Sequence, residues 1–179
     1  MTALTILLGG MAAGLLGGMT AGTAVAEEPA GVFAEFGGVE LRGQAPHYLE
    51  VGAGVFDLGD NDSAAGRIEL KGGNKLWFLG PAVGLLANTD GGVFGYGGVY
   101  ADIAYGNFVL TPFFALGGYA EGDGPDLGGI FQFRSSIALS YEFTGKARLG
   151  LSFAHISNAS IYDDNPGAEE IYVFYSHPF

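Results

Sequence analysis

The chain has 179 residues, no cysteine, 33 glycines and a formal net charge of −12, with only seven Lys and Arg residues. This charge argues against nucleic acid as a partner, because phosphate backbones are bound by clustered Lys and Arg side chains. The mean hydropathy is positive at +0.30, yet no apolar run beyond the N-terminal region reaches the roughly 18 residues of a membrane helix. Apolar residues spread along alternating strands are expected instead, which is typical of a transmembrane β-barrel.

The N-terminal residues 1–26 are mostly Ala, Gly, Leu, Met and Thr and end in Ala24-Val25-Ala26. An apolar stretch followed by a small-x-small site predicts a secretory signal peptide cleaved after Ala26, although no Lys or Arg precedes the stretch. The alternative is an N-terminal anchor helix, which the pairs Gly9-Gly10 and Gly17-Gly18 disfavour, since glycine weakens helices.

Residues 27–47 contain one alternating piece, Val32 to Leu41, which we interpret as a periplasmic lead-in or as part of an extra first strand. From Tyr48 to Phe179 apolar and polar residues alternate with the period of a strand, between turns rich in Gly, Asn and Asp. Eight strands are predicted, at 48–57, 64–72, 75–89, 92–105, 108–121, 129–143, 146–157 and 169–179. Pro81 lies inside the third of them and predicts a bulge or a local irregularity there.

The predicted fold is all-β, an eight-stranded antiparallel transmembrane β-barrel over residues 48–179, because such barrels combine an even strand number with apolar-out, polar-in alternation. Eight strands enclose an interior that side chains can fill. The inward-facing Arg134, Glu142, Glu50 and Arg148 are therefore expected to form a paired polar core. A soluble periplasmic lipid-binding barrel, with apolar faces around a cavity and His155 pointing inward, is the alternative.

Acidic residues cluster in the predicted loops, at Asp57, Asp60, Asp62, Asp123, Asp126, Asp163 and Asp164. Such clusters are ordinarily solvated loop tips; a divalent-cation bridge to anionic lipid is the second interpretation. His47 and His177 have no partners at metal-ligand spacing, so no metal site is expected. Trp77 is interpreted as an interface or packing aromatic.

One group of residues near the C-terminus has the composition of a hydrolytic site. His155 and Ser157 share the face of a predicted strand that also carries Leu149, Leu151 and Phe153, and Glu169 has the matching parity on the next strand. A carboxylate, an imidazole and a hydroxyl on one surface can perform acyl transfer, with the carboxylate orienting the imidazole and the imidazole taking the hydroxyl proton. Polar groups on a lipid-facing surface are costly and therefore indicate function.

The segment His155-Ile156-Ser157-Asn158-Ala159-Ser160, with Asn165-Pro166-Gly167-Ala168-Glu169 after it, resembles the active-site region of the lipid A 3-O-deacylases, the PagL family. The resemblance covers about 25 residues and includes a His-x-Ser motif with a Glu twelve residues after the Ser. It implies Ser157 as nucleophile, His155 as general base and acid, and Glu169 as orienting carboxylate. Glu170, the adjacent competitor, has the parity of the barrel interior.

The resemblance also implies supporting residues around an oxyanion. Asn158 matches the Asn beside the nucleophile, and the oxyanion donors would be the backbone N–H of Ser160 and the side chain of Asn165. Ser160 departs from the family's usual Gly, which restricts the turn.

The predicted function is thus an outer-membrane esterase that removes the 3-O-linked acyl chain of lipid A, within lipopolysaccharide, without metal or cofactor. The alternative is a non-catalytic structural or adhesion barrel. The sequence leaves open whether a second copy forms a homodimer at the lipid-facing surface.

Overall fold

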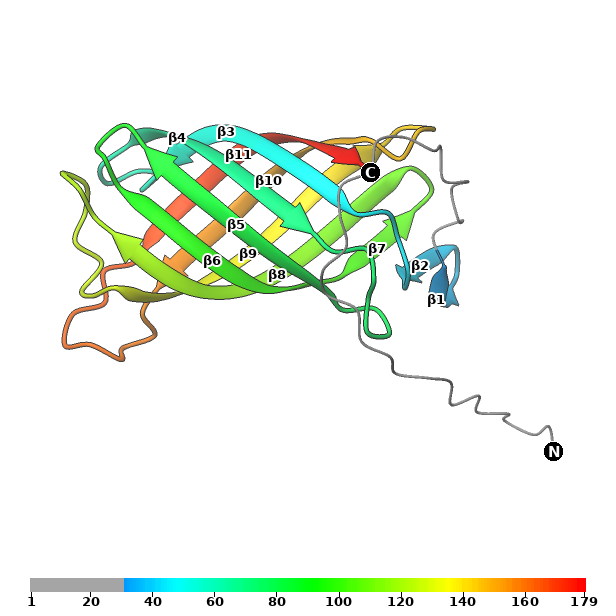
Figure 1. Ribbon diagram of the computed structural model, residues 1–179, viewed down its shortest axis with the longest axis horizontal. Coiled ribbons are helices and arrows are strands. Elements are labelled where there is room, and N and C mark those ends of the chain that lie inside the picture. Colours follow the sequence, from blue (N-terminus) through cyan, green and yellow to red (C-terminus); the bar gives the residue numbers. More distant parts are fainter. Residues whose placement is uncertain (1–30) are drawn as a thin grey trace, which may run out of the picture.

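A computed structural model describes residues 31–179, which form strands joined by turns and loops (Figure 1). The predicted signal peptide lies outside these residues. The strands are β1 (Val32–Phe36), β2 (Val39–Arg42), β3 (Tyr48–Phe56), β4 (Ser63–Lys71), β5 (Gly80–Asn88), β6 (Val93–Tyr100), β7 (Asp102–Tyr105), β8 (Phe108–Ala120), β9 (Phe131–Glu142), β10 (Arg148–Ser157) and β11 (Ala168–Pro178). Within the described range no helix is long and apolar enough to span a membrane.

The predicted eight-stranded antiparallel barrel is confirmed. Each of β3, β4, β5, β6, β8, β9, β10 and β11 pairs with the next strand in that order, and β11 pairs with β3 to close the cylinder. Neighbours in this order are antiparallel, and short turns such as Gly106-Asn107 connect antiparallel strands directly.

The third predicted strand begins later than expected, and the bulge or local irregularity predicted at Pro81 is absent. Residues 75–79 form a tight loop in which the N–H of Leu76 and the carbonyl of Leu79 bond each other, and Trp77 has φ +59°. Pro81 is the second residue of β5 and pairs in regular register with Val99. A proline near a strand start removes little pairing, which explains why the register is undisturbed.

The fourth predicted strand, 92–105, is divided at Ala101 into β6 and β7. Both halves pair with β8, but on the other side β6 pairs with β5 and β7 pairs with β2. Since β5 starts only at Gly80, opposite Tyr100, the edge of β7 is left free for β2. The shorter third strand and the division of the fourth thus have one cause.

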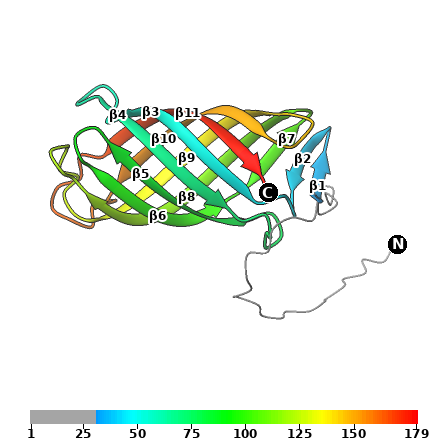
Figure 2. The ribbon, with the colours of Figure 1, turned by 45° about the horizontal axis from the view of Figure 1, so that its top comes forward.

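The alternating piece Val32 to Leu41 is a hairpin and not part of a single strand. Gly37 and Gly38 have φ values of +60° and +81°, which glycine adopts without steric cost, and they turn β1 back onto β2. The hairpin extends the sheet beside β7, at the end of the barrel where the C-terminus lies (Figure 2).

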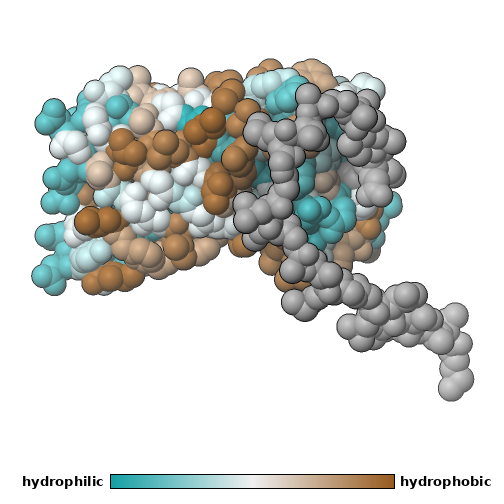
Figure 3. Space-filling view, viewed as in Figure 1, coloured by the Kyte–Doolittle hydropathy of each residue, from teal (hydrophilic) through white to brown (hydrophobic). Residues whose placement is uncertain are grey.

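Charged side chains fill the interior of the barrel, as predicted. Arg67 and Lys71 bond Glu50 at 2.6 and 2.7 Å, and Arg148 lies 3.0 Å from Glu142. The outer surface between the two ends is largely apolar (Figure 3). This arrangement is the reverse of a lipid-binding barrel with an apolar cavity, so that alternative is wrong.

The two ends of the barrel differ in their connections. One end, here named the loop end, carries the connections 57–62, 89–92, 121–130 and 158–167. The other, named the terminal end, carries 72–79, 106–107 and 143–147 together with Tyr48, Phe179 and the β1–β2 hairpin.

Candidate active site

Strands β10 and β11 bring His155 and Glu169 together at the loop end. The two residues are direct cross-strand partners, and on the other side of β10 His155 is opposite Ser135. Both side chains point outward, following Leu151 and Phe153 on the exposed face of β10. Strand alternation therefore places the imidazole and the carboxylate on the outer surface rather than in the polar interior.

The imidazole and the carboxylate are in hydrogen-bond contact. Nδ1 of His155 lies 3.0 Å from Oε1 of Glu169, and the two side chains are 47% and 41% exposed. This bond fixes Nδ1 as the donor to a carboxylate and leaves Nε2 to accept a proton. The electrostatic part of the attraction is moderated by solvent at this exposure.

Ser157, the last residue of β10, is half-buried on the same face, two residues beyond His155 and opposite Phe133. Within residues 31–179 its hydroxyl makes no hydrogen bond to the imidazole, so the direct contact expected from the sequence is not formed. Bonds between nucleophile and base are commonly loose in unliganded enzymes and tighten with substrate.

Glu170, the competitor for the carboxylate role, faces the interior. It is fully buried, and its Oε2 lies 2.9 Å from Nε of Arg134. The prediction from parity is confirmed, and Glu170 is out of reach of the outer surface.

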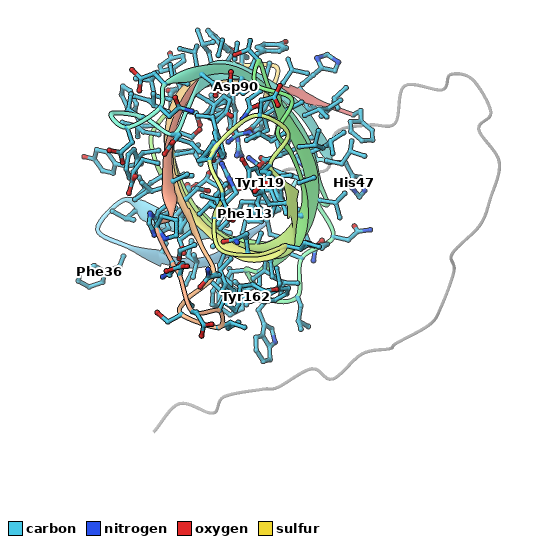
Figure 4. All side chains as sticks on the ribbon, turned by 90° about the vertical axis from the view of Figure 1, so that its left-hand side faces the viewer. Phe36, His47, Asp90, Phe113, Tyr119 and Tyr162 are labelled. Atoms are coloured by element: carbon cyan, nitrogen blue, oxygen red, sulfur yellow. The ribbon has the colours of Figure 1, made fainter. Side chains whose placement is uncertain are left out.

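Asn158 connects the two long loops behind Ser157. Its side chain is fully buried, and Nδ2 donates to the carbonyls of Leu127 and Asp164 at 2.9 and 2.7 Å. A second hydrogen bond joins the 158–167 loop to the start of β9, since the Tyr162 hydroxyl at the loop end (Figure 4) accepts a hydrogen bond of 3.2 Å from the N–H of Phe131. The turn after the serine is thus held against the 121–130 loop and the start of β9.

The two predicted oxyanion donors lie in this turn. The backbone N–H of Asn158 donates to Oδ1 of Asn165 at 2.9 Å, which leaves the Nδ2 group of that exposed side chain directed away from the bond. Ala159 and Ser160 have φ values of +53° and +61°. Such left-handed backbone costs roughly 1–2 kcal/mol for a residue other than glycine, which is the physical disadvantage of Ser160 at a position where the resemblance implies Gly.

Gly167 is a site residue that the sequence reasoning missed. A Cβ built on it would lie 2.9 Å from Cε1 and 3.5 Å from Nε2 of His155, and its φ is +74°. Only glycine therefore lets the chain pass this close to the imidazole. The dipeptide Pro166-Gly167 was a turn signal that could have indicated it.

The arrangement contains the elements of an acyl-transfer site: a carboxylate-bound imidazole, a neighbouring hydroxyl and a turn with backbone and amide donors. No group of three or more acidic or His side chains in the described part of the chain is arranged to hold a metal ion.

Fold and site together define a class of protein, a closed β-barrel that carries a Ser, a His and a Glu on its outer surface. Comparison with known proteins gives the particular family. The family described as "Lipid A 3-O-deacylase (PagL)" matches residues 30–178, and the chain belongs to this family.

Two relatives extend the comparison. The chain is similar to "Lipid A deacylase PagL" of Bordetella bronchiseptica, with 38% identity over 53 residues, a stretch that covers 30% of this chain and 30% of that protein. It also resembles the "Crystal structure of the outer membrane enzyme PagL", with a TM-score of 0.60 and 17% identity, covering 74% of this chain and 99% of that one. This second likeness concerns the fold.

Proposed function

We propose that the protein is an outer-membrane esterase that hydrolyses the 3-O-linked acyl chain of lipid A. The observation that carries the proposal is the 3.0 Å contact between His155 and Glu169 on the outer surface, with Ser157 next along the same face. These groups lie among exposed Leu and Phe side chains, a position that a lipid substrate reaches directly from the bilayer. A water-soluble substrate would not require such an apolar surrounding.

The proposed reaction has two steps. Oγ of Ser157 attacks the ester carbonyl while Nε2 of His155 takes the hydroxyl proton, and Glu169 stabilises the resulting imidazolium through Nδ1. The tetrahedral intermediate then breaks its bond to the 3-oxygen of the sugar, which takes this proton from the imidazolium and leaves as an alcohol, while the acyl group stays on Oγ of Ser157. Water, deprotonated by the same imidazole, then attacks the acyl-enzyme; the bond to Oγ breaks, the imidazolium returns the proton to Oγ of Ser157, and the free fatty acid is released.

Stabilisation of the tetrahedral oxyanion is assigned to the turn that follows the nucleophile. The backbone N–H of Ser160 and the Nδ2 group of Asn165 are the donors, because Asn165 is already oriented by its Oδ1 bond to the N–H of Asn158. Asn158 has a positioning role, since its buried amide ties the turn to Leu127 on the neighbouring loop.

The proposed location is the outer leaflet of the outer membrane. Barrels of this kind keep their short turns and termini on the periplasmic side and their longer loops outside, which makes the loop end extracellular. The site then lies at the depth of the lipid A sugar and its ester bonds. Lipopolysaccharide is the substrate-bearing molecule in that leaflet, and the reaction as written uses no metal or cofactor.

The test is mass spectrometry of lipid A after incubation with the purified barrel in vesicles. Ser157→Ala should abolish the loss of the 3-O-acyl chain, and His155→Ala should do nearly the same. Ser135→Ala is the matched control, because it makes the same chemical change on the same outer face one strand away. Full deacylation by Ser157→Ala would overturn the mechanism, and inactivity of the unaltered protein would favour a non-catalytic barrel.

A further inference from the structure

The β1–β2 hairpin is a part of the molecule that the proposed reaction does not use. The solved PagL barrel leaves about a quarter of this chain unmatched while being itself almost wholly covered. The described residues ahead of β3, 31–47, lie outside the eight-stranded cylinder.

The hairpin has two chemically different faces. Phe36 and Val39 are cross-strand partners on one face, and Glu35 and Glu40 are partners on the other. On the polar face, Nη1 of Arg42 reaches both carboxylate oxygens of Glu142 at 2.8 Å inside the barrel. The hairpin is therefore attached to the barrel through its polar face, and its apolar face, with Phe36 and Val39, points away from the interior.

Further contacts hold the base of the hairpin. Gln44 Nε2 donates to the carbonyl of Lys75 at 2.8 Å, and the Lys75 ammonium donates to the carbonyl of Arg42, the last residue of β2, at 3.4 Å. The rings of Phe33 and Phe78 meet with centroids 5.5 Å apart. These contacts join the hairpin to the loop between β4 and β5 and make it a continuation of the wall.

The apolar face of the hairpin continues the outer surface of the barrel without interruption. Successive cross-strand partners form one row of outward side chains, named here the terminal row: Phe36, Val39, Tyr105, Phe108 and Tyr141. Phe36 is 90% exposed and Tyr105 65% exposed. Figure 4 shows Phe36 outside the barrel wall and directed away from it.

We infer that the apolar face of the β1–β2 hairpin lies in the bilayer, at the interface of the periplasmic leaflet. This inference rests on the proposed membrane location. Its physical basis is that Phe108 and Tyr141 share one continuous sheet surface with Phe36. The ring centroids of Phe108 and Tyr141 lie 5.6 Å apart on the barrel. Aromatic side chains at such a position are the usual contacts with the headgroup region of a membrane, and a contiguous apolar patch of this kind is unusual against water.

The experiment uses tryptophan as a probe of lipid contact in the full-length protein. The chain has one tryptophan, Trp77, which is replaced by Phe so that the introduced tryptophan is the source of the tryptophan emission. Phe36→Trp then reports on the apolar face and Glu35→Trp on the opposite face of the same hairpin. Leu151→Trp, on the exposed face of β10, reports on the barrel wall.

Each variant is refolded into phosphatidylcholine vesicles with and without bromine on the acyl chains. The expected result is that Phe36→Trp and Leu151→Trp emit at shorter wavelength than Glu35→Trp. Brominated lipid should remove most of the emission of the first two variants and leave the emission of Glu35→Trp unchanged. Quenching of Leu151→Trp without quenching of Phe36→Trp would overturn the inference while leaving the membrane location intact. Absence of quenching in both would overturn the membrane location as well.

A second copy of the chain is the competing occupant, because β1 also presents a free strand edge. In that case Phe36→Trp would shift to shorter wavelength without quenching by bromine. Sedimentation of the detergent-solubilised protein would then show a dimer that Phe36→Asp dissociates, a result that would overturn the inference.

Discussion

The loop end and the terminal end of the barrel use charge in opposite ways. At the terminal end, cations and anions are buried in pairs, such as Lys75 with Asp102 and Arg42 with Glu142. At the loop end the carboxylates are mostly exposed, and no Lys or Arg side chain among the described residues is exposed there. The seven Lys and Arg residues of the chain are Arg42, Arg67, Lys71, Lys75, Arg134, Lys146 and Arg148.

This difference means that the charged groups of the terminal end contribute to the stability of the fold, whereas those of the loop end are available for reaction with a substrate. A buried ion pair satisfies each charge with its partner and leaves no group free to react, and breaking it is costly. The His155–Glu169 contact at the loop end is exposed and stabilises the fold little, so its groups remain available for a substrate. Matched amide substitutions at the two ends should therefore have opposite consequences.

The largest effect is expected for Glu169→Gln at the loop end. Loss of the orienting carboxylate should lower kcat by up to about 10⁴-fold, since the imidazole loses the partner that fixes its tautomer. The urea midpoint should be unchanged, because the side chain is 41% exposed. Deacylation rates and fluorescence-monitored unfolding in vesicles measure the two quantities, and a loss of stability that accounts for the lost activity would remove the distinction.

At the terminal end, Asp102→Asn should reverse this pattern. Asp102 is fully buried, lies 2.9 Å from Lys75 and 3.0 Å from Arg148, and accepts a hydrogen bond from Thr111. Removing its charge leaves the buried Lys75 without a carboxylate partner and leaves Arg148 with Glu142 alone, and should reduce the unfolding free energy by about 3–5 kcal/mol. Turnover per folded molecule should stay the same; a lower kcat in the folded fraction would show that the ends are coupled.

Substitutions of Asn165 test whether its side chain donates to the oxyanion or only positions the turn. Asn165→Ala should lower kcat about a hundred- to a thousandfold, the usual cost of one oxyanion donor, and should be less severe than Ser157→Ala. Asn165→Asp is the informative partner, because it keeps the oxygen that accepts the N–H of Asn158 but loses the donor group. Activity retained by Asn165→Asp and lost in Asn165→Ala would assign Asn165 to positioning alone.

The lack of an exposed cation at the loop end predicts an effect of divalent metal on phosphorylated substrate. Lipid A phosphates approaching this acidic end are repelled, and Mg²⁺ that neutralises them should raise kcat/KM about tenfold at low ionic strength. Lipid A from which the phosphates have been removed is the control and should show no such gain. An equal gain for both lipids would point to an effect of Mg²⁺ on the protein.

The smallest effect is expected for Asp57→Asn, in the loop after β3. Burial, with Asp60 and Glu169 nearby, raises the pKa of this carboxyl above its ordinary value of 3.8. A raised folded-state pKa means that the fold is favoured when the group is protonated and loses that stability as pH rises. Asp57→Asn should therefore raise the urea midpoint at pH 7 but not near pH 3, and Asn also tolerates the φ of +59° at this position.

Asp163→Asn is the control for that comparison, because its carboxylate is exposed. It should leave the midpoint unchanged at both pH values. An equal gain for Asp57→Asn at both pH values would show that the effect is not due to the charge.

Alternation along the sequence was sufficient to predict the barrel, its strand number and which side chains face outward. The reason is that a strand has a side-chain period of two, so one polar interior and one apolar exterior appear in the sequence directly. The same rule separates Glu169 from Glu170, since adjacent residues on a strand face opposite sides.

Only the tertiary structure decided the features that depend on contacts between distant segments. The late start of β5, the pairing of β2 with β7, and the place of Gly167 against His155 all arise from such contacts. The buried amide of Asn158 likewise finds Leu127 from another loop. Periodicity fixes the direction of a side chain because direction is local, whereas the neighbour it meets depends on how the whole sheet closes.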